Sequence, residues 1–218
     1  MITRLSQLNK FFYPGMITHF PDNEKKIYLT FDDGPTPEIT NRVLALLFQY
    51  NIKATFFCRG DHVEAHPSVF SEIQKQGHTT GNHGYAHLHG WYTHINKYIA
   101  DCNKAAELIQ NKIYRPPYGK ITPAQYYQLK KEYTLYLWTA LSWDFHPWVS
   151  KEMCYRIAKR NVFAGSILVF HDTAKAAPKL LYALPRLIEY GLNKGYQFNP
   201  LPVNTGSDRK DNVERESF

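Results

Sequence analysis

The sequence alternates short strand-like runs with longer helix-like segments, and this alternation limits the folds open to the chain more than any other feature. The first strand is predicted at residues 26–31 (KIYLTF), and residues 37–50 then carry apolar side chains at helical spacing. Because repeated strand–helix units place their strands parallel, the fold class is α/β, as a barrel or a doubly wound sheet. Further strands are predicted at residues 53–58, 78–81, 112–115, 133–138, 166–170 and 196–198, and further helices at 66–76, 93–110, 122–132, 150–161 and 178–190.

One domain accounts for the whole alternation. The chain has 218 residues, which is enough to bury a core without a disulfide or metal staple, and no linker-like break interrupts residues 20–200. We therefore expect an N-terminal extension at residues 1–20 and a single domain at 21–203. The polar segment 204–218 is expected to be a disordered tail. A content of 44% hydrophobic and 21% charged residues excludes a wholly disordered chain and a membrane bundle.

The net charge, the cysteines and the N-terminus indicate which partners and which cellular compartment to expect. The formal net charge of +7 would suit an acidic partner, but the sequence has no nucleic-acid-binding motif, so we do not expect nucleic acid to be that partner. The three cysteines lack CxxC spacing and predict neither a disulfide framework nor a zinc knuckle. No apolar stretch is long enough for a transmembrane helix, and no secretion signal is visible, so the sequence alone predicts a cytoplasmic protein.

Two adjacent acids, Asp32 and Asp33, stand where the first predicted strand ends, and a Gly-Pro dipeptide follows them. Adjacent acids in such a turn can form an Asx turn or cap a helix. They can also bring two carboxylates to a reactive site. The residues at this point leave both interpretations open.

A histidine pair, His83 and His87, lies in the segment GNHGYAHLH after the third predicted strand. A spacing of four lets both rings face one point if the segment makes a helical turn. The glycines favour a loop instead, and histidines in loops are commonly structural or exposed. His89 and His94 are the competing candidates for a shared ligand site.

Three further polar side chains also follow predicted strands. Arg115 begins the segment RPPYG, Asp144 lies in SWDFHPW, and His171 ends the apolar strand ILVFH. Each has a structural interpretation, as part of a rigid turn or as a satisfied core group. In parallel barrels and open sheets, however, the carboxyl ends of the strands converge on one mouth, where catalytic groups gather. We therefore expect all five sites to lie together.

Taken in order, these motifs resemble those of the polysaccharide deacetylase family with a NodB-homology domain, carbohydrate esterase family four. The resemblance implies a distorted (β/α)7-type barrel and a hydrolase that uses a divalent metal to remove N-acetyl, or sometimes O-acetyl, groups from sugars. An N-acetylated carbohydrate is the implied partner, and the oligomeric state stays open. The resemblance covers roughly residues 27–200 and is carried by TFDDGP (30–35), the His83 and His87 pair, RPPYG (115–119), residues 138–145 and LVFHD (168–172).

The same resemblance implies a metal site made of Asp33, His83 and His87. The ion is commonly zinc in the family, and cobalt, nickel or manganese are alternatives. Two imidazoles and one carboxylate leave coordination positions open for water and substrate, as in catalytic zinc sites. Because this ligand set also serves non-haem iron, the three residue types alone do not name the ion.

The resemblance also assigns the remaining polar groups. Asp32 would be the base that takes the proton of the attacking water, and Arg115 would pair with it and keep it ionised. The backbone N–H of Tyr118 would stabilise the oxyanion. His171 would protonate the departing amine, and Asp144 would raise the pKa of His171 and orient its ring.

Aromatic side chains near the motifs are the candidates for sugar binding. Phe145 and Trp143, together with Tyr118, are predicted to contact the substrate. Large rings on such loops can stack on pyranose faces, or they can simply pack the fold. The additional rings in these segments are Trp91, Tyr92 and Trp148.

Three positions depart from the family pattern. Gly84 stands where the family usually has Ser or Thr, Leu141 where it has Asp, and Phe145 where it has Trp. These departures keep open an alternative function, that of a catalytically silent carbohydrate-binding relative. The resemblance also implies action at the cell envelope, and the sequence alone leaves open which sugar and which acetyl position are used.

Overall fold

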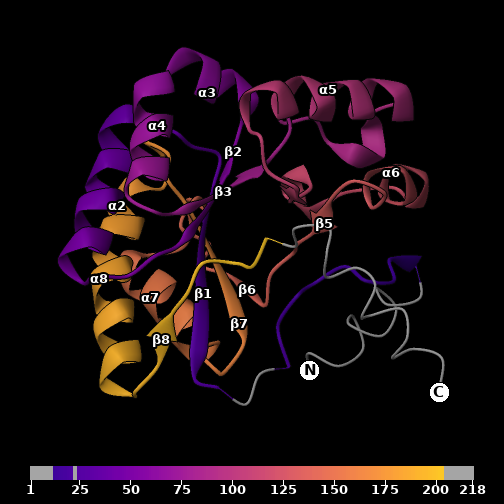
Figure 1. Cartoon of the computed structure of the whole chain (residues 1–218). Helices are drawn as coiled ribbons and strands as arrows, with labels where there is room; N and C mark the ends of the chain where they lie inside the picture. The colour runs from indigo at the N-terminus through magenta and orange to yellow at the C-terminus, as the bar shows by residue number, and fades with distance from the viewer. Residues whose placement is uncertain (1–11, 22–23, 204–218) are drawn as a thin grey trace.

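The computed structural model describes residues 12–21 and 24–203, and its centre is a parallel sheet (Figure 1). Seven strands pair in the order β5-β4-β3-β2-β1-β7-β6, and β8 pairs with the start of β1. The predicted tail at 204–218 and most of the predicted N-terminal extension lie outside the described residues. The strands are β1 (Lys26–Asp32), β2 (Thr55–Cys58), β3 (Thr79–Asn82), β4 (Ile113–Tyr114), β5 (Thr134–Leu135), β6 (Ala140–Leu141), β7 (Ser166–His171) and β8 (Gln197–Phe198).

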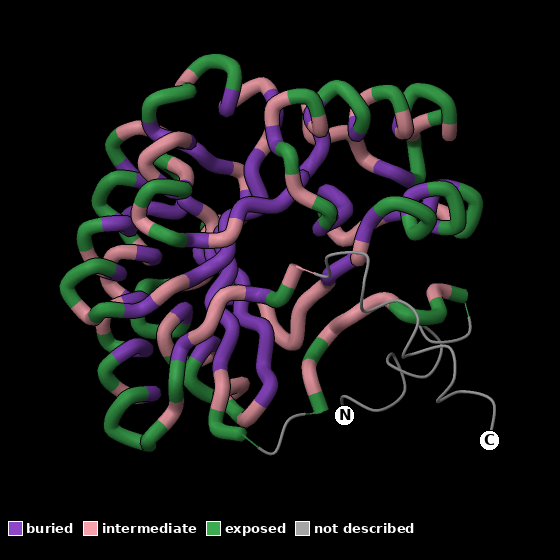
Figure 2. Tube along the Cα trace, in the orientation of Figure 1, coloured by how far each residue is buried: buried purple, intermediate pink, exposed green. Residues whose placement is uncertain are grey.

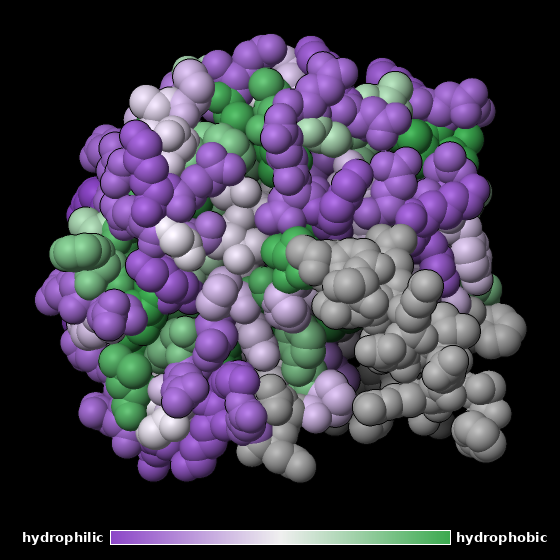
Figure 3. All heavy atoms as spheres, in the orientation of Figure 1, coloured by the Kyte–Doolittle hydropathy of each residue, from purple (hydrophilic) through white to green (hydrophobic). Residues whose placement is uncertain are grey.

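Helices surround this sheet. In the view of Figure 1, α2, α4 and α8 lie to the left of the strands, and α5 and α6 lie at the upper right, near β5. Their outer faces are hydrophilic and exposed, and the strands at the centre are buried (Figures 2 and 3). No helix in the described part of the chain has the length and apolar composition that crossing a bilayer requires. The helices are α2 (Pro37–Gln49), α3 (Gly60–Ala65), α4 (Pro67–Lys75), α5 (Ile95–Leu108), α6 (Pro123–Leu129), α7 (Lys151–Arg160) and α8 (Ala177–Asn193), with 3-10 turns η1 (Gly90–Tyr92) and η2 (Pro117–Gly119).

The central strand β1 shows how the sheet sorts its side chains. Ile27, Leu29 and Phe31 pack into the core formed with the outer helices, whereas Tyr28 belongs to a separate cluster inside the curved sheet. Because successive side chains of a strand point to opposite faces, residues two and four positions after Tyr28 also face inward. The second of these is Asp32, which is therefore presented to the interior at the carboxyl end of the strand.

The same alternation aims the polar residues that follow other strands. On β7, Ile167 lies in the interior cluster, so His171 four positions later faces inward as well. On β4, Ile113 lies in the interior cluster and Arg115 follows two positions later. Because side chains alternate along each strand, the acidic, basic and imidazole groups lie on the same face of the sheet.

Two elements differ from the sequence prediction. The strand predicted at 133–138 is shorter in the structure, where only Thr134–Leu135 forms β5, and a separate strand β6 follows at Ala140–Leu141. The chain leaves β4 and crosses to β7 between them: Tyr136 N–H donates to the Tyr114 carbonyl, and Thr139 N–H donates to the Ile167 carbonyl. Helix α3 was not predicted, since six residues are too few to show helical periodicity. The predicted parallel α/β alternation is otherwise confirmed.

An N-terminal segment bridges the gap that this crossing leaves. Ile17 N–H donates to Leu135 O at 2.9 Å, and the Ile17 carbonyl accepts from Leu137 N–H at 2.8 Å. Further along, Phe20 N–H donates to Gly165 O at 2.9 Å. These hydrogen bonds join the β5 edge to the start of β7, so the segment closes the side of the half-barrel that the strands leave open.

We expect Gly165→Ala to destabilise this closure by about 3 kcal/mol, through left-handed strain and steric overlap together. Gly165 has a φ of +85°, and a Cβ there would lie 1.9 Å from the Phe20 carbonyl oxygen. The matched control is Gly77→Ala, which has a φ of +76° but meets nothing closer than a lysine carbon at 3.7 Å. Urea unfolding of both variants measures the difference. Equal losses of stability would show that the N-terminal segment around Phe20 moves away from the added methyl group without further destabilising the fold.

Candidate active site

A cavity of about 580 Å³ opens where the predicted motifs meet. It lies at the carboxyl ends of β1, β3, β4, β6 and β7, the edge at which parallel sheets collect functional groups. The structure thus brings together the five sites that the sequence placed after separate strands. The lining residues are Asp32, Asp33, His83, His87, Tyr118, Trp138, Leu141, Trp143, Phe145, His171, Thr173 and Lys175.

Asp33, His83 and His87 form one cluster in the cavity. One potential ligand atom from each lies within 4.8 Å of the others. The Asp33 Oδ1 atom is 3.0 Å from His87 Nε2 and 3.6 Å from His83 Nε2. His83 Nδ1 donates to the Arg115 carbonyl oxygen at 2.7 Å, which leaves the lone pair of Nε2 directed into the cluster.

The protonation states in this cluster suit a cation. Burial lowers the pKa of His83 to about 4, against the opposing effect of the nearby Asp32 charge, so its ring is neutral at pH 7. Burial acts to raise the pKa of Asp33, but the close imidazoles of His87 and His83 and the nearby His171 outweigh it and lower that pKa well below its usual range. A neutral imidazole and an ionised carboxylate are the forms that bind metals.

The carboxylate of Asp33 and the two imidazoles beside it are also suited to bind a metal ion. Asp33 Oδ1 is buried and has no hydrogen-bond partner among the described residues, although two ring nitrogens lie close to it. A buried acceptor without a partner is costly. A divalent cation shared by the carboxylate and the two imidazoles would satisfy it, and this donor set is typical of zinc sites that keep open positions.

Beside the cluster, Arg115 holds Asp32. The Arg115 Nη1 atom donates to Asp32 Oδ1 at 2.6 Å and to Thr30 Oγ1 at 2.7 Å, and Nη2 donates to the Leu137 carbonyl at 2.9 Å. The arginine is fully buried, with its guanidinium 4.1 Å above the Phe57 ring. Because Arg115 and Asp32 are both buried, the ion pair between them holds the Asp32 carboxylate in one orientation.

His171 is fixed on the other side of Asp32. The two residues are partners in the β1–β7 register. His171 Nδ1 donates to Asp144 Oδ1 at 2.8 Å, and His171 N–H donates to Asp144 Oδ2 at 2.7 Å. Burial would lower the pKa of His171, but the hydrogen bond and charge of Asp144 raise it to about 9. The ring is therefore protonated at neutral pH, with Nδ1 occupied.

Unusual backbone conformations gather at the cavity. Among the described residues, five non-glycine residues have a positive φ, and four of them line the cavity: Asp33 at 78°, His87 at 55°, Tyr118 at 58° and Trp143 at 60°. Such conformations cost energy and persist where the surroundings impose them, most often at functional sites. Their clustering is independent support for this cavity as the functional one.

The loop around Gly84 explains one departure from the family pattern. Asp101 on α5 accepts hydrogen bonds from the N–H groups of Tyr85 at 2.8 Å and Ala86 at 2.9 Å. A Cβ on Gly84 would lie 2.8 Å from the same carboxylate. Asp101 thus fixes the loop from helix α5, in an arrangement that a residue larger than glycine at position 84 would disturb.

Sequence reasoning missed a second buried support. Asp172 accepts from Gly34 N–H at 3.1 Å and from the Thr40 hydroxyl at 2.5 Å, which ties the turn after Asp33 to helix α2 and to β7. Burial raises the pKa of Asp172 to about 7. Its position directly after His171 was the available signal, whereas nothing in the sequence marks Thr40 as its partner.

The parallel half-barrel and the carboxylate and imidazole groups at its carboxyl edge define the class of the protein, a hydrolase of the α/β type. The sequence profile of the polysaccharide deacetylase family matches residues 20–136. The chain belongs to this family, carbohydrate esterase family four, and its curated homologues are named carbohydrate and peptidoglycan deacetylases. The predicted family, barrel fold and hydrolase activity are thereby confirmed.

Individual relatives agree with this assignment. A peptidoglycan-N-acetylglucosamine deacetylase of Bacillus cereus is 34% identical over 195 residues, which cover 84% of this chain and 90% of that protein. A crystal structure of a peptidoglycan N-acetylglucosamine deacetylase superposes with a TM-score of 0.84 at 29% identity, covering 89% of this chain and 94% of the other. A pseudoenzyme of the same family from Bacillus anthracis has a TM-score of 0.76 at 21% identity, with 86% and 68% covered, and shares the fold.

Proposed function

We propose that the chain is a metal-dependent deacetylase that removes the N-acetyl group from an amino sugar of peptidoglycan or a related glycan, with residues 21–203 as its catalytic domain. The observation that carries the proposal is the convergence of Asp33, His83 and His87 in a cavity that also holds Asp32 and His171. The names of the relatives support the choice of glycan.

Asp33, His83 and His87 would hold the divalent ion, zinc in the first place, with cobalt, nickel or manganese as alternatives. A bound ion of this kind lowers the pKa of water and polarises a carbonyl, which permits amide hydrolysis near neutral pH. The neutral state of His83 and the ionised state of Asp33 favour its binding.

The remaining groups would handle protons and charge. Asp32, aimed by Arg115, accepts the proton of the attacking water. The backbone N–H of Tyr118 stabilises the oxyanion of the tetrahedral intermediate. His171 donates a proton to the departing amine, and Asp144 keeps it charged and oriented. In the proposed reaction, Trp143 and Phe145 contact the sugar beside the reacting acetamide, since both residues line the cavity.

The test is acetate release by metal-free protein before and after reloading. We expect chelation to abolish release from peptidoglycan glycan strands and from N-acetylglucosamine oligomers, and zinc or cobalt to restore it. Binding of these glycans without acetate release under any of the four ions would overturn the proposal in favour of the silent carbohydrate-binding relative.

The charge state of His171 predicts an alkaline limit to activity. If His171 must be protonated to donate, then kcat/KM falls as the pH rises through about 9, the pKa that Asp144 maintains. Asp144→Asn removes the charge that opposes burial, so the pKa of His171 falls and the alkaline limb moves to lower pH. The pH profiles of both proteins on an N-acetylglucosamine oligomer measure this, and coincident alkaline limbs would remove His171 from the proton-donating role.

A further inference from the structure

Cations and tyrosine rings alternate on the side of the molecule that is formed by α7 and α8. Each helix contributes three side chains at intervals of four residues, a spacing that aligns them along one side of the helix. The two rows meet across the helix pair, and we name them together the α7–α8 strip. Its members are Lys151, Tyr155 and Lys159 on α7 and Tyr182, Arg186 and Tyr190 on α8.

Tyrosine rings contact the three cations of the strip. Lys151 Nζ lies 5.0 Å from the centroid of the Tyr182 ring, and Arg186 Cζ lies 3.8 Å from the same centroid. Lys159 Nζ lies 4.6 Å from the centroid of the Tyr190 ring. A ring attracts a cation through its quadrupole and does not cancel the charge. The three cations are therefore held in place while their charges stay available to a partner.

This side of the molecule also carries most of the positive excess of the chain. Helices α7 and α8 hold six basic residues against two acidic ones, a net +4 of the formal +7. Within the described part of the chain, no cation of the strip forms a salt bridge with a carboxylate. Glu189 on α8 instead accepts a hydrogen bond at 2.7 Å from the hydroxyl of Tyr50, at the end of α2. Cations gathered without counter-charges repel one another, so this surface favours a negatively charged partner.

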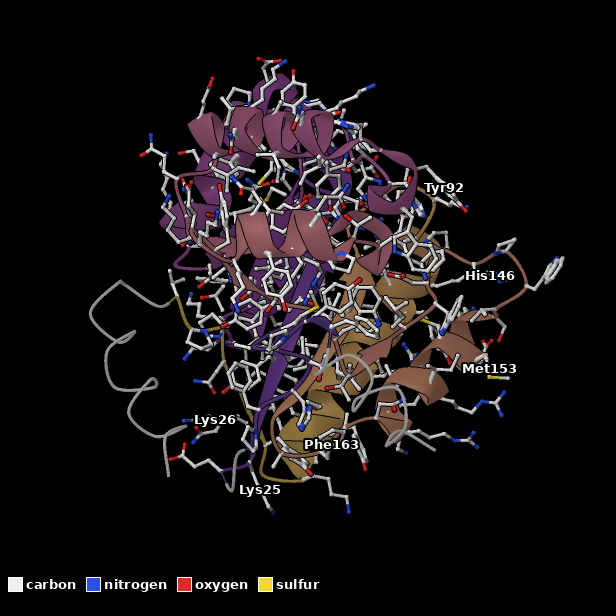
Figure 4. All side chains as sticks on the ribbon, turned by 90° about the vertical axis from the view of Figure 1, so that its right-hand side faces the viewer. Lys25, Lys26, Tyr92, His146, Met153 and Phe163 are labelled. Atoms are coloured by element: carbon white, nitrogen blue, oxygen red, sulfur yellow. The ribbon has the colours of Figure 1, made fainter. Side chains whose placement is uncertain are left out.

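The strip is open to solvent and separate from the cavity. Helix α7 lies on the outside of the molecule, where Met153 points away from the sheet (Figure 4). The three cations of the strip are exposed, as are Arg156 and Arg160 on the outer face of α7. No member of the strip lines the cavity. An inference about this surface therefore does not rest on the proposed function.

The spacing of the cations suits a linear partner. Lys151 and Lys159 are eight residues apart on one helix, which corresponds to about 12 Å along its axis. Arg186 stands between them, because it lies midway between the two tyrosines that contact these lysines. The three charges thus follow one another at intervals of about 6 Å along the helix pair, too far apart to converge on one small anion.

The rings of the strip are not open to stacking. Tyr155, Tyr182 and Tyr190 are partly buried, and each has a lysine Nζ over its ring at 4.6 to 5.7 Å from the centroid. They are therefore unsuited to stack on bases or sugars or to enter a bilayer, which leaves charge as the means of contact. In a polymer with phosphate in its main chain the charges follow one line, whereas the carboxylates of a polyuronate project from successive sugars to different sides.

We propose that the α7–α8 strip binds a linear phosphate polymer through Lys151, Arg186 and Lys159, and so attaches the protein to an anionic polymer while the cavity stays accessible. The polymer lies along the helix pair and places successive phosphate groups against the three cations. Release of the counter-ions of the polymer contributes much of the affinity, so binding weakens as the salt concentration rises.

The experiment measures binding of fluorescently labelled, long-chain inorganic polyphosphate to the full chain, by anisotropy at low and at physiological salt. We expect the triple variant Lys151→Gln, Lys159→Gln, Arg186→Gln to raise the dissociation constant at low salt by at least about 30-fold and to reduce its salt dependence. An unchanged dissociation constant in this variant would overturn the proposal, as would a wild-type protein that does not bind polyphosphate.

The matched control is the triple variant Arg42→Gln, Lys75→Gln, Lys97→Gln. It removes one arginine and two lysines, as the first variant does, but from exposed positions on α2, α4 and α5. The net charge of the two variants is the same, so we expect the control to bind polyphosphate within about twofold of the wild type. Equal losses in both variants would show that overall charge, and not the strip, attracts the polymer.

Further variants separate the charges of the strip from its role in packing α7 on α8. The exchange Lys151→Arg, Lys159→Arg, Arg186→Lys keeps every charge over its ring and should bind like the wild type. If the triple glutamine variant does not fold, the single variants Lys151→Gln and Lys159→Gln are each expected to raise the dissociation constant by about 3- to 10-fold. Single variants that bind like the wild type would contradict the proposal.

Two other anionic probes test the class of partner. We expect polygalacturonate and vesicles of phosphatidylglycerol and phosphatidylcholine to bind more weakly than polyphosphate, and their binding to respond less to the triple glutamine variant. Polygalacturonate that binds more tightly than polyphosphate would assign the strip to a carboxylated polymer. Tighter binding of the vesicles, lost in the same variant, would assign it to a lipid surface, and either result would overturn the proposal.

Discussion

Asp33→Asn is expected to empty the proposed metal site and to lower acetate release by more than about 10³-fold, because the ion that polarises the carbonyl and acidifies water is lost. Asparagine is the least disturbing replacement, since it tolerates the left-handed conformation that Asp33 adopts at a φ of 78°. It removes only the negative charge that two imidazole nitrogens face at 3.0 and 3.6 Å. Zinc content by mass spectrometry and kcat on an N-acetylglucosamine oligomer measure the result.

The matched control for this variant is Asp61→Asn. Asp61 pairs with Arg59 and does not line the cavity, so its replacement should leave both zinc content and kcat unchanged. If Asp33→Asn bound a full equivalent of zinc and hydrolysed substrate at the wild-type rate, the assignment of the cluster as the ion site would be wrong.

Arg115→Met should destabilise the fold by about 3–5 kcal/mol, because it leaves the Asp32 carboxylate buried without its partner. Asp32 is 3% exposed and Arg115 is completely buried, so water in the cavity compensates little for the lost ion pair. The arginine also bonds Thr30 and the Leu137 carbonyl, and both would lose a donor. Urea unfolding of the metal-free protein measures the loss without a contribution from ion binding.

A second variant separates the buried charge from general damage to packing. In the double variant Asp32→Asn, Arg115→Met the unpaired charge is gone, and we expect part of the lost stability to return while activity stays low. A double variant as unstable as Arg115→Met alone would show that the guanidinium acts through packing on Phe57 and its hydrogen bonds to Thr30 and Leu137.

Much of the site could be predicted because it depends on local sequence. Apolar strand patterns identified β1 and β7, and the period of two then fixes which way Asp32 and His171 point. The order of the motifs predicted which side chains share the cavity. The contact between Arg115 and Asp32 followed from the family resemblance, and the structure contains it at 2.6 Å.

The remaining features depend on contacts between distant segments. β6 has two residues and exists because it pairs with β7 after the chain has crossed from β4, which no local pattern encodes. The Gly84 loop is held by Asp101, a residue in the middle of helix α5, so the sequence of the loop itself does not show this contact. The aromatic rings were visible in the sequence, but which of them line the cavity depends on how separate loops are placed in space.

The strand order has a consequence for how the enzyme matures on the ribosome. β1 lies inside the sheet between β2 and β7, and its longest ladder is with β7, which the chain contributes 139 residues later in the register Ile27↔Ser166. Contacts so distant in sequence form late and slow folding, because a long loop must close first. Since Asp32 and His171 meet only through this ladder, a nascent chain cannot hydrolyse anything until nearly its last strand has emerged, and until then the edge of β1 stays open to aggregation or to a chaperone.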